Sequence, residues 1–252
     1  MDEWGVGSYE KTAEELEPAA DVVVAALGLS GGERVLDVAC GTGNAALVAH
    51  EAGAEVAGID MSPRLVEVAR ERVPQGTFRV ADATELPCDD GQFDAAVSVF
   101  GVIFARPAER AAAEIARVVR PGGAVAVTSW PARGPVFAAV TLMRQALARV
   151  RPPAPEGPPP VNWGDPAVLE KLFGPYGDLE VTEQQLAHHQ LPPEEVFDRW
   201  ERFHPIWIGA RRELEPAGEW ASLREKSIAA LRDGELGAGV ASPYLLAVLR
   251  RG

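Results

Sequence analysis

Short apolar runs alternate with helix-like stretches between residues 34 and 130 of this sequence. The apolar runs, rich in β-branched residues, cover 34–39, 55–60, 77–81, 93–99 and 123–130. The helix-like stretches cover 45–52, 63–72 and 107–118, and the last two begin with Pro, which suits a first helical turn. Strands that alternate with helices in this way usually pair in parallel. The pattern therefore predicts a doubly wound α/β fold with helices on both faces of the sheet.

The pattern loosens after residue 130. A helix is expected over 136–150, an aromatic-rich helical block over 193–232, and strands over 179–190 and 240–250. The Pro-rich stretch 152–160 excludes both a helix and a central strand. Such a stretch is either a surface spacer or a lid over an active site, and the sequence leaves both alternatives open.

Length, charge and cysteine usage narrow the class of protein. A chain of 252 residues, 47% of them hydrophobic, suffices for one α/β domain. The net charge of −13 would repel a phosphate backbone, so no nucleic-acid partner is expected. Cys40 and Cys88 form no metal-ligand or disulfide pattern, which argues against a metal site. No apolar run reaches the roughly 20 residues that span a bilayer, so we expect a cytoplasmic protein without membrane contact.

A glycine-containing loop follows the first predicted strand. The segment Val35-Leu-Asp-Val-Ala-Cys-Gly-Thr-Gly-Asn-Ala-Ala46 runs from a buried strand through Gly41 and Gly43 into a helix. Glycines at this carboxyl edge let a ligand approach the backbone, where open α/β sheets bind nucleotides. The same residues satisfy the loose dinucleotide fingerprint, and Asp60 stands where a ribose-binding acid is expected. An NAD-dependent enzyme is therefore one alternative.

A cationic cofactor fits this loop better than a dinucleotide. Asp37 lies inside the strand just before the glycines, where its carboxylate would repel a pyrophosphate. Asp82 and Ala83 follow the third strand and offer a carboxylate and a small apolar wall for an adenine ring. No Tyr-x-x-x-Lys pair provides the proton relay of a common reductase. These features favour S-adenosylmethionine, whose sulfonium and ammonium groups suit an acidic site.

Five segments resemble, in order and spacing, the signatures of class I S-adenosylmethionine-dependent methyltransferases. They are Leu36-Asp-Val-Ala-Cys-Gly-Thr-Gly43, Gly58-Ile-Asp-Met-Ser62, Ala81-Asp-Ala-Thr-Glu-Leu-Pro87, Phe93-Asp94 and Arg120-Pro-Gly-Gly123. The likeness is strongest to small-molecule methyltransferases, including quinone-biosynthesis enzymes and similar bacterial secondary-metabolism members. It covers about residues 4–130 well and the last strand loosely.

The resemblance implies a Rossmann-like fold with a mostly parallel, seven-stranded sheet and helical insertions that form a cap over an acceptor pocket. It implies one domain over residues 1–252. Within it, 1–30 would form helices that cover the cofactor and 31–130 the cofactor-binding core. Segments 131–165 and 192–234 would be substrate-side insertions, and 236–252 the final strand.

The family pattern also implies roles for single residues in holding the cofactor. Asp37 and Gly41 would border its methionine part, Asp60 would accept hydrogen bonds from both ribose hydroxyls, and Met61 would pack on the adenine. Asp82 would accept from the adenine amine.

Four further positions complete the expected cofactor site. Ala83 would offer its backbone amide to the adenine, and Phe100 would lie beside the transferable methyl. Ala39 replaces the first glycine of the usual loop, and we expect its φ to be negative, which alanine tolerates. The segment from Trp4 to Tyr9 resembles one that folds over the cofactor, so Tyr9 either closes the pocket or only packs an amino-terminal helix.

Methyl transfer needs mainly alignment and exclusion of water, and a base is often optional. The candidate bases are His188, His189 and His204. Alternation along a strand allows at most one of the first two to face the pocket.

Aromatic residues around His204 suit a flat or apolar acceptor. Trp200, Phe203 and Trp207 would either roof the acceptor pocket or form the core of the insertion itself. The expected function is transfer of a methyl group from S-adenosylmethionine, which leaves S-adenosylhomocysteine, to an aromatic or apolar small molecule. One alternative is a protein of the same fold that binds the cofactor and promotes cyclisation or decarboxylation; another is a non-catalytic binding protein. The sequence does not indicate the oligomeric state.

Overall fold

One mixed sheet forms the centre of the protein. The computed structural model describes residues 4–152, 161–188, 191–236 and 239–252. In the sheet order β3-β2-β1-β4-β5-β8-β6, the strands β1 to β5 pair in parallel, and β8 runs antiparallel between β5 and β6. A two-residue strand, β7 (Glu235–Leu236), pairs with β8. The strands of the main path are β1 (Arg34–Val38), β2 (Glu55–Asp60), β3 (Thr77–Val80), β4 (Phe93–Ser98), β5 (Val119–Ser129), β6 (Gly177–His188) and β8 (Gly239–Arg251). The prediction of a mostly parallel, seven-stranded α/β sheet is confirmed.

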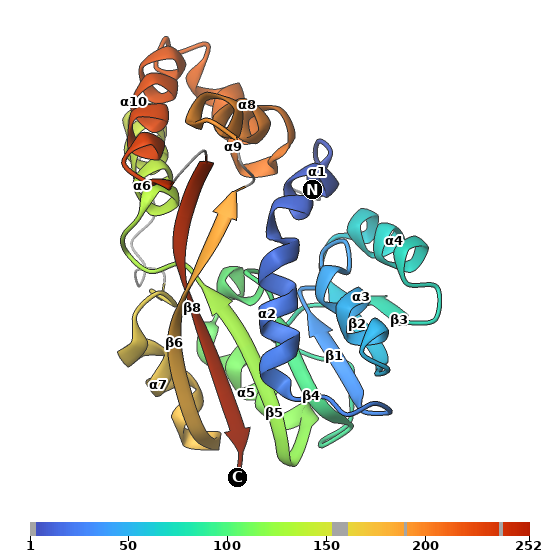
Figure 1. The fold of residues 1–252 in the computed structure, drawn as a ribbon. Coiled ribbons are helices and arrows are strands. Elements are labelled where there is room, and N and C mark those ends of the chain that lie inside the picture. The colour runs from blue at the N-terminus through green and yellow to red at the C-terminus, as the bar shows by residue number, and fades with distance from the viewer. Residues whose placement is uncertain (1–3, 153–160, 189–190, 237–238) are drawn as a thin grey trace.

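Helices cover both faces of this sheet (Figure 1). One layer contains α2 (Glu17–Leu27), α3 (Asn44–Glu51) and α4 (Pro63–Arg72), and the other contains α5 (Ala108–Val118) and α7 (Pro166–Phe173). The reason lies in the strand period of two: Val35 packs with the first layer, whereas Leu36 and Val38 pack with the second. The same alternation continues along β5, so both faces of the central strands are buried.

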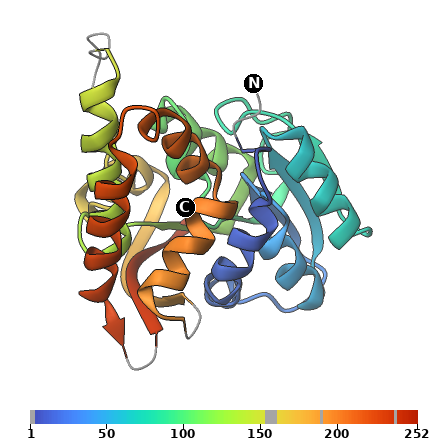
Figure 2. The same ribbon diagram turned by 90° about the horizontal axis from the view of Figure 1, so that it is seen from above.

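A separate group of helices stands beyond the carboxyl ends of the parallel strands. It consists of α6 (Pro135–Val150), α8 (Pro193–Phe203), α9 (Pro205–Leu214) and α10 (Trp220–Arg232). Figures 1 and 2 show α6 and α10 side by side at the edge of this group. The four helices share a hydrophobic core of their own, built around residues such as Met143, Phe197 and Leu231. We call this group the cap.

The start of β5 differs from the sequence prediction. The strand expected from residue 123 begins at Val119, because the Arg-Pro-Gly-Gly segment stays in the sheet. Its pairing with β4 shifts register between Phe93 and Ala95, and a Cβ on Gly123 would lie 2.5 Å from the carbonyl oxygen of Asp94. The glycine therefore allows a close backbone approach at an irregularity in the ladder.

The helix α7 was missed by the sequence analysis. Asp165 caps it by accepting a hydrogen bond from the N–H of Ala167 at 2.9 Å, and Pro166 opens its first turn. An Asp-Pro pair before an apolar run is a recognised start signal, so the sequence did carry the information.

Among the described residues, no helix has the length and apolar character needed to cross a bilayer. The Pro-rich residues 153–160 lie outside the described part of the chain, so the spacer and lid alternatives both stay open.

Candidate cofactor and acceptor site

A cavity of about 780 Å³ lies where the carboxyl ends of the parallel strands meet the cap. Loops that follow β1, β2, β3 and β4 line one part of it, and the amino-terminal segment, α6 and α9 line another. All of the residues predicted from the sequence to hold the cofactor line this one cavity: Tyr9, Asp37, Ala39, Gly41, Asp60, Met61, Asp82, Ala83 and Phe100. The structure thus brings together positions that span more than 90 residues of sequence.

Asp37 fastens the glycine loop to the helix that follows it. Its side chain is 2% exposed, and its Oδ2 accepts a hydrogen bond from the N–H of Ala46 at 3.0 Å. Burial raises the pKa of this carboxyl to about 8, and the nearby charge of Asp60 adds to the rise. A cation brought close to Asp37 would lower its pKa again by charge attraction and favour the ionised form.

Asp60 ends β2 and connects two neighbouring loops. Its Oδ2 accepts from the N–H of Gly41, and its Oδ1 accepts from the N–H of Ser62, both at 2.8 Å. Ser62 in turn caps α4 by accepting from the N–H of Leu65. The carboxylate is therefore held at a fixed place at the edge of the cavity.

Two residues that are not glycine adopt left-handed backbone beside the cavity. Ala39 has a φ of +54° and Phe100 a φ of +56°. The expectation of a negative φ at Ala39 was wrong. The loop after β1 turns sharply there: the N–H of Cys40 donates to the carbonyl of Ile59, and a Cβ on Gly101 would lie 2.6 Å from the Ala39 Cβ. Strain of this kind is typical of functional sites.

Aromatic neighbours hold the ring of Phe100, although its backbone is left-handed. Its ring stacks on Trp130 with centroids 4.0 Å apart, and Tyr244 meets it edge-on at 5.4 Å. Its N–H donates to the hydroxyl of Thr128 at 2.9 Å. These contacts present the start of the loop after β4 to the cavity in one orientation.

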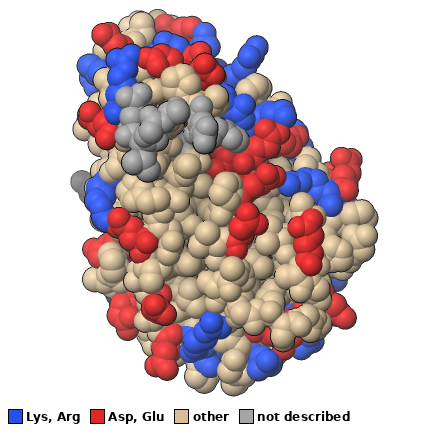
Figure 3. All heavy atoms as spheres, in the orientation of Figure 1, with Lys and Arg blue, Asp and Glu red and all other residues tan. Residues whose placement is uncertain are grey.

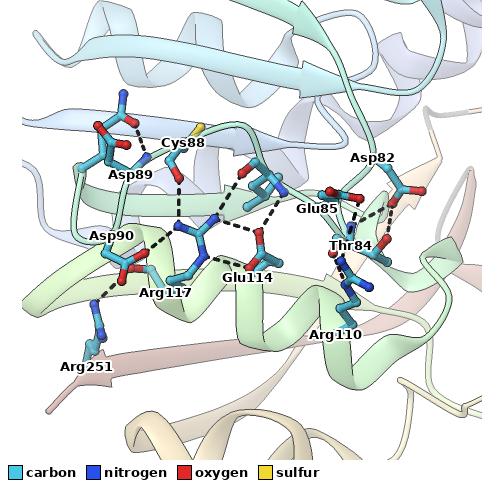
Figure 4. Close-up of polar contacts among 12 residues, drawn as sticks. Asp82, Thr84, Glu85, Cys88, Asp89, Asp90, Arg110, Glu114, Arg117 and Arg251 are labelled. Atoms are coloured by element: carbon cyan, nitrogen blue, oxygen red, sulfur yellow. Dashed lines mark hydrogen bonds and ion pairs between the residues drawn. The ribbon is translucent and has the colours of Figure 1, made fainter.

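The loop that carries Asp82 is tied down on its own residues and on α5 (Figure 4). Asp82 Oδ1 accepts from both the N–H and the hydroxyl of Thr84 at 2.8 Å, and Arg110 donates to the Thr84 carbonyl at 2.7 Å. Met61, 66% exposed, and the buried Ala83 also line the cavity here. An exposed methionine beside a small buried residue is a suitable environment for a flat ring.

Arg117 of α5 anchors the rest of the same loop, as Figure 4 shows. Its guanidinium donates to the carbonyl oxygens of Cys88 at 2.8 Å and Leu86 at 3.1 Å, and it pairs with Glu114 and Asp90. Glu114 also accepts from the N–H of Leu86. The loop after β3 is therefore positioned by a charged network on the helix beneath it.

The amino-terminal segment closes over the cavity with aromatic rings. Trp4 contacts Phe104 with centroids 4.8 Å apart and Tyr9 at 5.8 Å, and Tyr9 meets His204 at 6.1 Å. Burial, with a contribution from the Asp60 charge, raises the pKa of Tyr9. Trp4 and Tyr9 line the cavity and also contact His204 at the start of α9. Closure of Tyr9 over a bound cofactor stays a prediction.

His204 lies against Trp4 and Tyr9 but does not line the cavity. It caps α9, where its Nδ1 accepts from the N–H of Ile206 at 3.2 Å, and burial lowers its pKa to about 4. The neutral ring therefore carries its proton on Nε2, which makes it a donor rather than a base.

The other two candidate bases stand at the end of β6. The backbone of His188 pairs with Val240, but its side chain and the whole of His189 lie outside the described part of the structure. Their role as bases stays a prediction.

The aromatic residues of the insertion form its core rather than the roof of the cavity. Trp200 and Trp207 are 4% and 2% exposed and stack on each other at 5.7 Å. Neither they nor Phe203 line the cavity. The cap side is instead lined by residues that the sequence analysis did not single out: Leu147, Arg151, Pro205, Ile206, Gly209, Ala210, Arg212 and Glu213. Helical spacing on α9 could have indicated the shared face of Ile206 and Ala210.

The fold and the site together define the class of protein. A parallel sheet with a glycine loop after β1, an acid at the end of β2 and another after β3 forms a Rossmann-like domain that binds a nucleoside-containing cofactor. Residues 35–123 match the model of a family described as "Methyltransferase domain". The chain belongs to the class I S-adenosylmethionine-dependent methyltransferases, a family whose cofactor is S-adenosylmethionine, and is related to those of quinone biosynthesis.

Relatives in sequence extend beyond the matched domain. The uncharacterized protein Rv1403c of Mycobacterium tuberculosis is 33% identical over 236 residues, which cover 90% of this chain and 85% of that protein. Rv1405c of the same organism is 38% identical over 180 residues, which cover 68% of this chain but only 63% of the relative's length. A demethylmenaquinone methyltransferase of Renibacterium salmoninarum is 40% identical over 116 residues, 45% of this chain and 49% of that enzyme.

Solved structures share the fold. Phosphoethanolamine N-methyltransferase 2 of Haemonchus contortus, in complex with S-adenosyl-L-methionine, matches with a TM-score of 0.59 at 20% identity, over 93% of this chain and 53% of that one. The [4+2]-cyclase SpnF matches with a TM-score of 0.56 at 24% identity, over 98% of this chain and 85% of that one. At this level of identity, the likeness shows the architecture alone.

Proposed function

We propose that this protein transfers the methyl group of S-adenosylmethionine to a small-molecule acceptor with an apolar or aromatic body. The observation that carries the proposal is the cavity of about 780 Å³, which joins the glycine loop at one side to the cap at the other. A cavity built in this way can hold both reactants next to each other and away from water.

The charges around the cavity fit the proposed cofactor. Asp37, Asp60 and Asp82 line its core side, whereas the basic residues among its described lining, Arg151 and Arg212, come from the cap side. S-adenosylmethionine carries a sulfonium and an ammonium, which carboxylates attract. The pKa of Asp37 is raised by burial and by the nearby charge of Asp60, and a bound cation would favour its ionised form.

Individual residues can then be given roles. Each oxygen of Asp60 can accept a second hydrogen bond, which suits two ribose hydroxyls. Asp82 uses its Oδ1 for Thr84, so its Oδ2 is the oxygen that would accept from the adenine amine. Met61 and Ala83 would flank the adenine, and the loop from Ala39 to Gly41 would border the methionine part.

The reaction would be an in-line displacement. The cofactor, held by the loop from Ala39 to Gly41 and by Asp60, would supply a methyl group already activated by its sulfonium. The residues of this chain would align the two reactants and exclude water. Phe100 would do so on the core side of the cavity, and Phe104 and Ile206 towards the cap. His204 would hold the start of α9 rather than remove a proton from the acceptor, because its Nδ1 already accepts from the N–H of Ile206.

Calorimetric titration with S-adenosylmethionine and S-adenosylhomocysteine tests the cofactor site. Asp60→Ala and Asp82→Ala should each weaken binding about tenfold or more, since hydrogen bonds to a charged group contribute roughly 1.5–3 kcal/mol. Asp89→Ala, an exposed position on the same loop as Asp82 that does not line the cavity, is the matched control. Wild-type affinity in both test variants would refute the assignment.

A second experiment separates methyl transfer from other chemistry. Cofactor with a labelled methyl group is offered with a panel of small aromatic and apolar acceptors, and label is followed into products. Transfer of label supports the proposal. Tight cofactor binding without any labelled product would instead favour a non-methyl reaction, such as the cyclisation named for the structural neighbour SpnF.

A further inference from the structure

A second hollow of about 450 Å³ adjoins the cavity on the cap side. Three arginines and two glutamates of α8, α9 and the turn after α9 line it, together with the amino-terminal Val6 and Gly7. Val6 and Arg212 line both the hollow and the main cavity, so the two spaces share these two residues of their walls. We call the second space the outer hollow. Its position makes it a natural extension of the acceptor side.

The walls of the outer hollow are held in a fixed relation. Gly7 has a φ of +76°, and a Cβ at this position would lie 2.6 Å from the Ile208 side chain and 3.1 Å from the Phe203 carbonyl oxygen. The amino-terminal segment therefore approaches the junction of α8 and α9 more closely than any other residue type would allow. The outer hollow is thus a formed feature between two packed segments.

The charges in the outer hollow do not cancel. Arg211 pairs with Glu215 at 3.0 Å and lies 3.9 Å from Glu201, which Arg224 also approaches at 3.8 Å. Both glutamates of the hollow are therefore matched by cations.

Two arginines are left over. Arg202 contacts only the ring of Phe203, and Arg212 has no hydrogen bond or ion pair within the part of the chain that the structure describes. Guanidinium groups form planar, paired hydrogen bonds with oxyanions such as carboxylates and phosphates. The charged residues that line the hollow, three arginines and two glutamates, leave a net charge of +1 there in a chain whose net charge is −13.

The outer hollow is separate from the residues that would hold the cofactor. None of the glycine loop, Asp60 or Asp82 lines it. Figure 3 shows acidic and basic side chains intermixed over the cap and around the lower edge of one face of the molecule, with a largely uncharged area between them. An anion at Arg202 and Arg212 would accordingly belong to the acceptor.

We propose that the acceptor carries an oxyanion, which Arg202 and Arg212 bind in the outer hollow while its apolar body occupies the cap side of the main cavity. This inference rests on the proposed function, because it names the class of acceptor for the same site. Arg212 lines both spaces. It would contact the anion in the outer hollow, next to the point where the acceptor's apolar body enters the main cavity.

A matched pair of fluorescent probes tests the inference. The dye 8-anilinonaphthalene-1-sulfonate differs from N-phenyl-1-naphthylamine only by its sulfonate, and both become fluorescent in apolar pockets. Each is titrated into the full chain saturated with S-adenosylhomocysteine. The wild type should bind the sulfonate at least about fivefold more tightly than the neutral dye, and the preference should shrink with added salt. Equal affinity for the two dyes would overturn the proposal.

The double variant Arg202→Gln/Arg212→Gln should lose about fivefold or more in affinity for the sulfonate and keep its affinity for the neutral dye. Arg79→Gln is the control, since Arg79 is an exposed arginine on β3 that lines neither space. An equal loss for both dyes would mean that the cavity itself was damaged, and would count against a specific anion site, as would no loss.

The same titrations keep the two proposals apart. Normal binding of S-adenosylhomocysteine without a sulfonate preference would reject the anionic acceptor and leave the methyltransferase proposal standing. Failure of the wild type to bind S-adenosylhomocysteine would reject the proposed function, and with it the reading of the hollow as an acceptor site. Displacement of the dye by 1-naphthoate or by 1-naphthyl phosphate then indicates which oxyanion is preferred.

Discussion

Single residues at the cavity carry conformations and charges that a stable fold alone would avoid. Ala39 and Phe100 adopt left-handed backbone, and Asp37 is a carboxyl buried near a second carboxylate. Each feature costs free energy in the ligand-free protein. All three residues line the same cavity, which is where such costs are expected if a bound ligand offsets them.

The strain at Ala39 predicts an unusual response to glycine. Ala39→Gly should be more stable than the control Ala52→Gly by about 1–2 kcal/mol. Only at position 39 does the substitution remove a Cβ from a left-handed backbone, which alanine disfavours and glycine tolerates. Ala52 is exposed and has a φ of −76°. The gain in unfolded-state entropy is common to both variants and cancels in the comparison. Urea unfolding of the two variants measures the difference, and equal midpoints would contradict it.

Asp37 predicts a pH dependence of the ligand-free protein. Its folded pKa of about 8 lies above the ordinary value of 3.8, so the folded state favours the protonated acid. Stability should therefore fall as pH rises through this window, by at most about 1.4 kcal/mol per pH unit from this group. Asp37→Asn should show a flatter dependence between pH 5.5 and 7.5 in urea unfolding, whereas the exposed Asp89→Asn should keep the wild-type slope. If the stability of Asp37→Asn kept the wild-type dependence on pH, the titration of Asp37 would not be its cause.

At the scale of elements, the helix α5 positions the loop after β3, which lies next to the cavity. The loop after β3 has little regular structure, yet Arg117 and Glu114 of α5 bind its carbonyl and N–H groups (Figure 4). A loop tied in this way keeps Asp82 in place without a strand or helix of its own. The position of Asp82 at the cavity therefore depends on α5.

Arg117→Met should destabilise the protein by about 2 kcal/mol, because it leaves the Leu86 and Cys88 carbonyls and two carboxylates without their donor. The control is Arg120→Met, which removes an ion pair with Asp94 whose arginine side chain is 49% exposed and should cost about 0.5 kcal/mol. Urea unfolding compares the two variants. Equal losses would show that the Arg117 network adds no more than a surface pair.

At the scale of the whole molecule, the amino-terminal segment joins the core to the cap. Glu15 is 3% exposed and accepts hydrogen bonds from Arg199 at 2.8 Å and from the Trp200 indole at 3.2 Å. Both donors belong to α8 of the cap, whereas Tyr9 of the same segment lines the cofactor side of the cavity. One segment therefore connects the two halves of the site.

Glu15→Gln should cost about 2–3 kcal/mol, because an amide has one acceptor oxygen in place of two and removes the buried charge 2.8 Å from Arg199. The neighbouring Glu14→Gln, with a 41% exposed side chain 3.6 Å from Arg199, should cost less than about 0.5 kcal/mol. Hydrogen exchange should also show faster exchange of the amides of residues 9–16 in Glu15→Gln alone. Similar exchange in both variants would contradict the connection.

The mostly parallel α/β architecture and the place of the glycine loop were determined by sequence alone. Local patterns encode both: a period of two in apolar runs, Pro at helix starts, and glycines after the first strand. The acids Asp37, Asp60 and Asp82 were recognisable for the same reason: each lies near the carboxyl end of a predicted strand or directly after one, and the carboxyl ends of parallel strands share one edge.

Only the tertiary structure decided which residues complete the site. The φ of Ala39 depends on its close contact with Gly101, and the inward or outward direction of the cap aromatics depends on how four helices pack together. Trp200 turned into the cap core and Ile206 towards the cavity, although both lie in one amphipathic block. Such choices are set by contacts between segments far apart in the chain, whose free energies a local pattern does not contain.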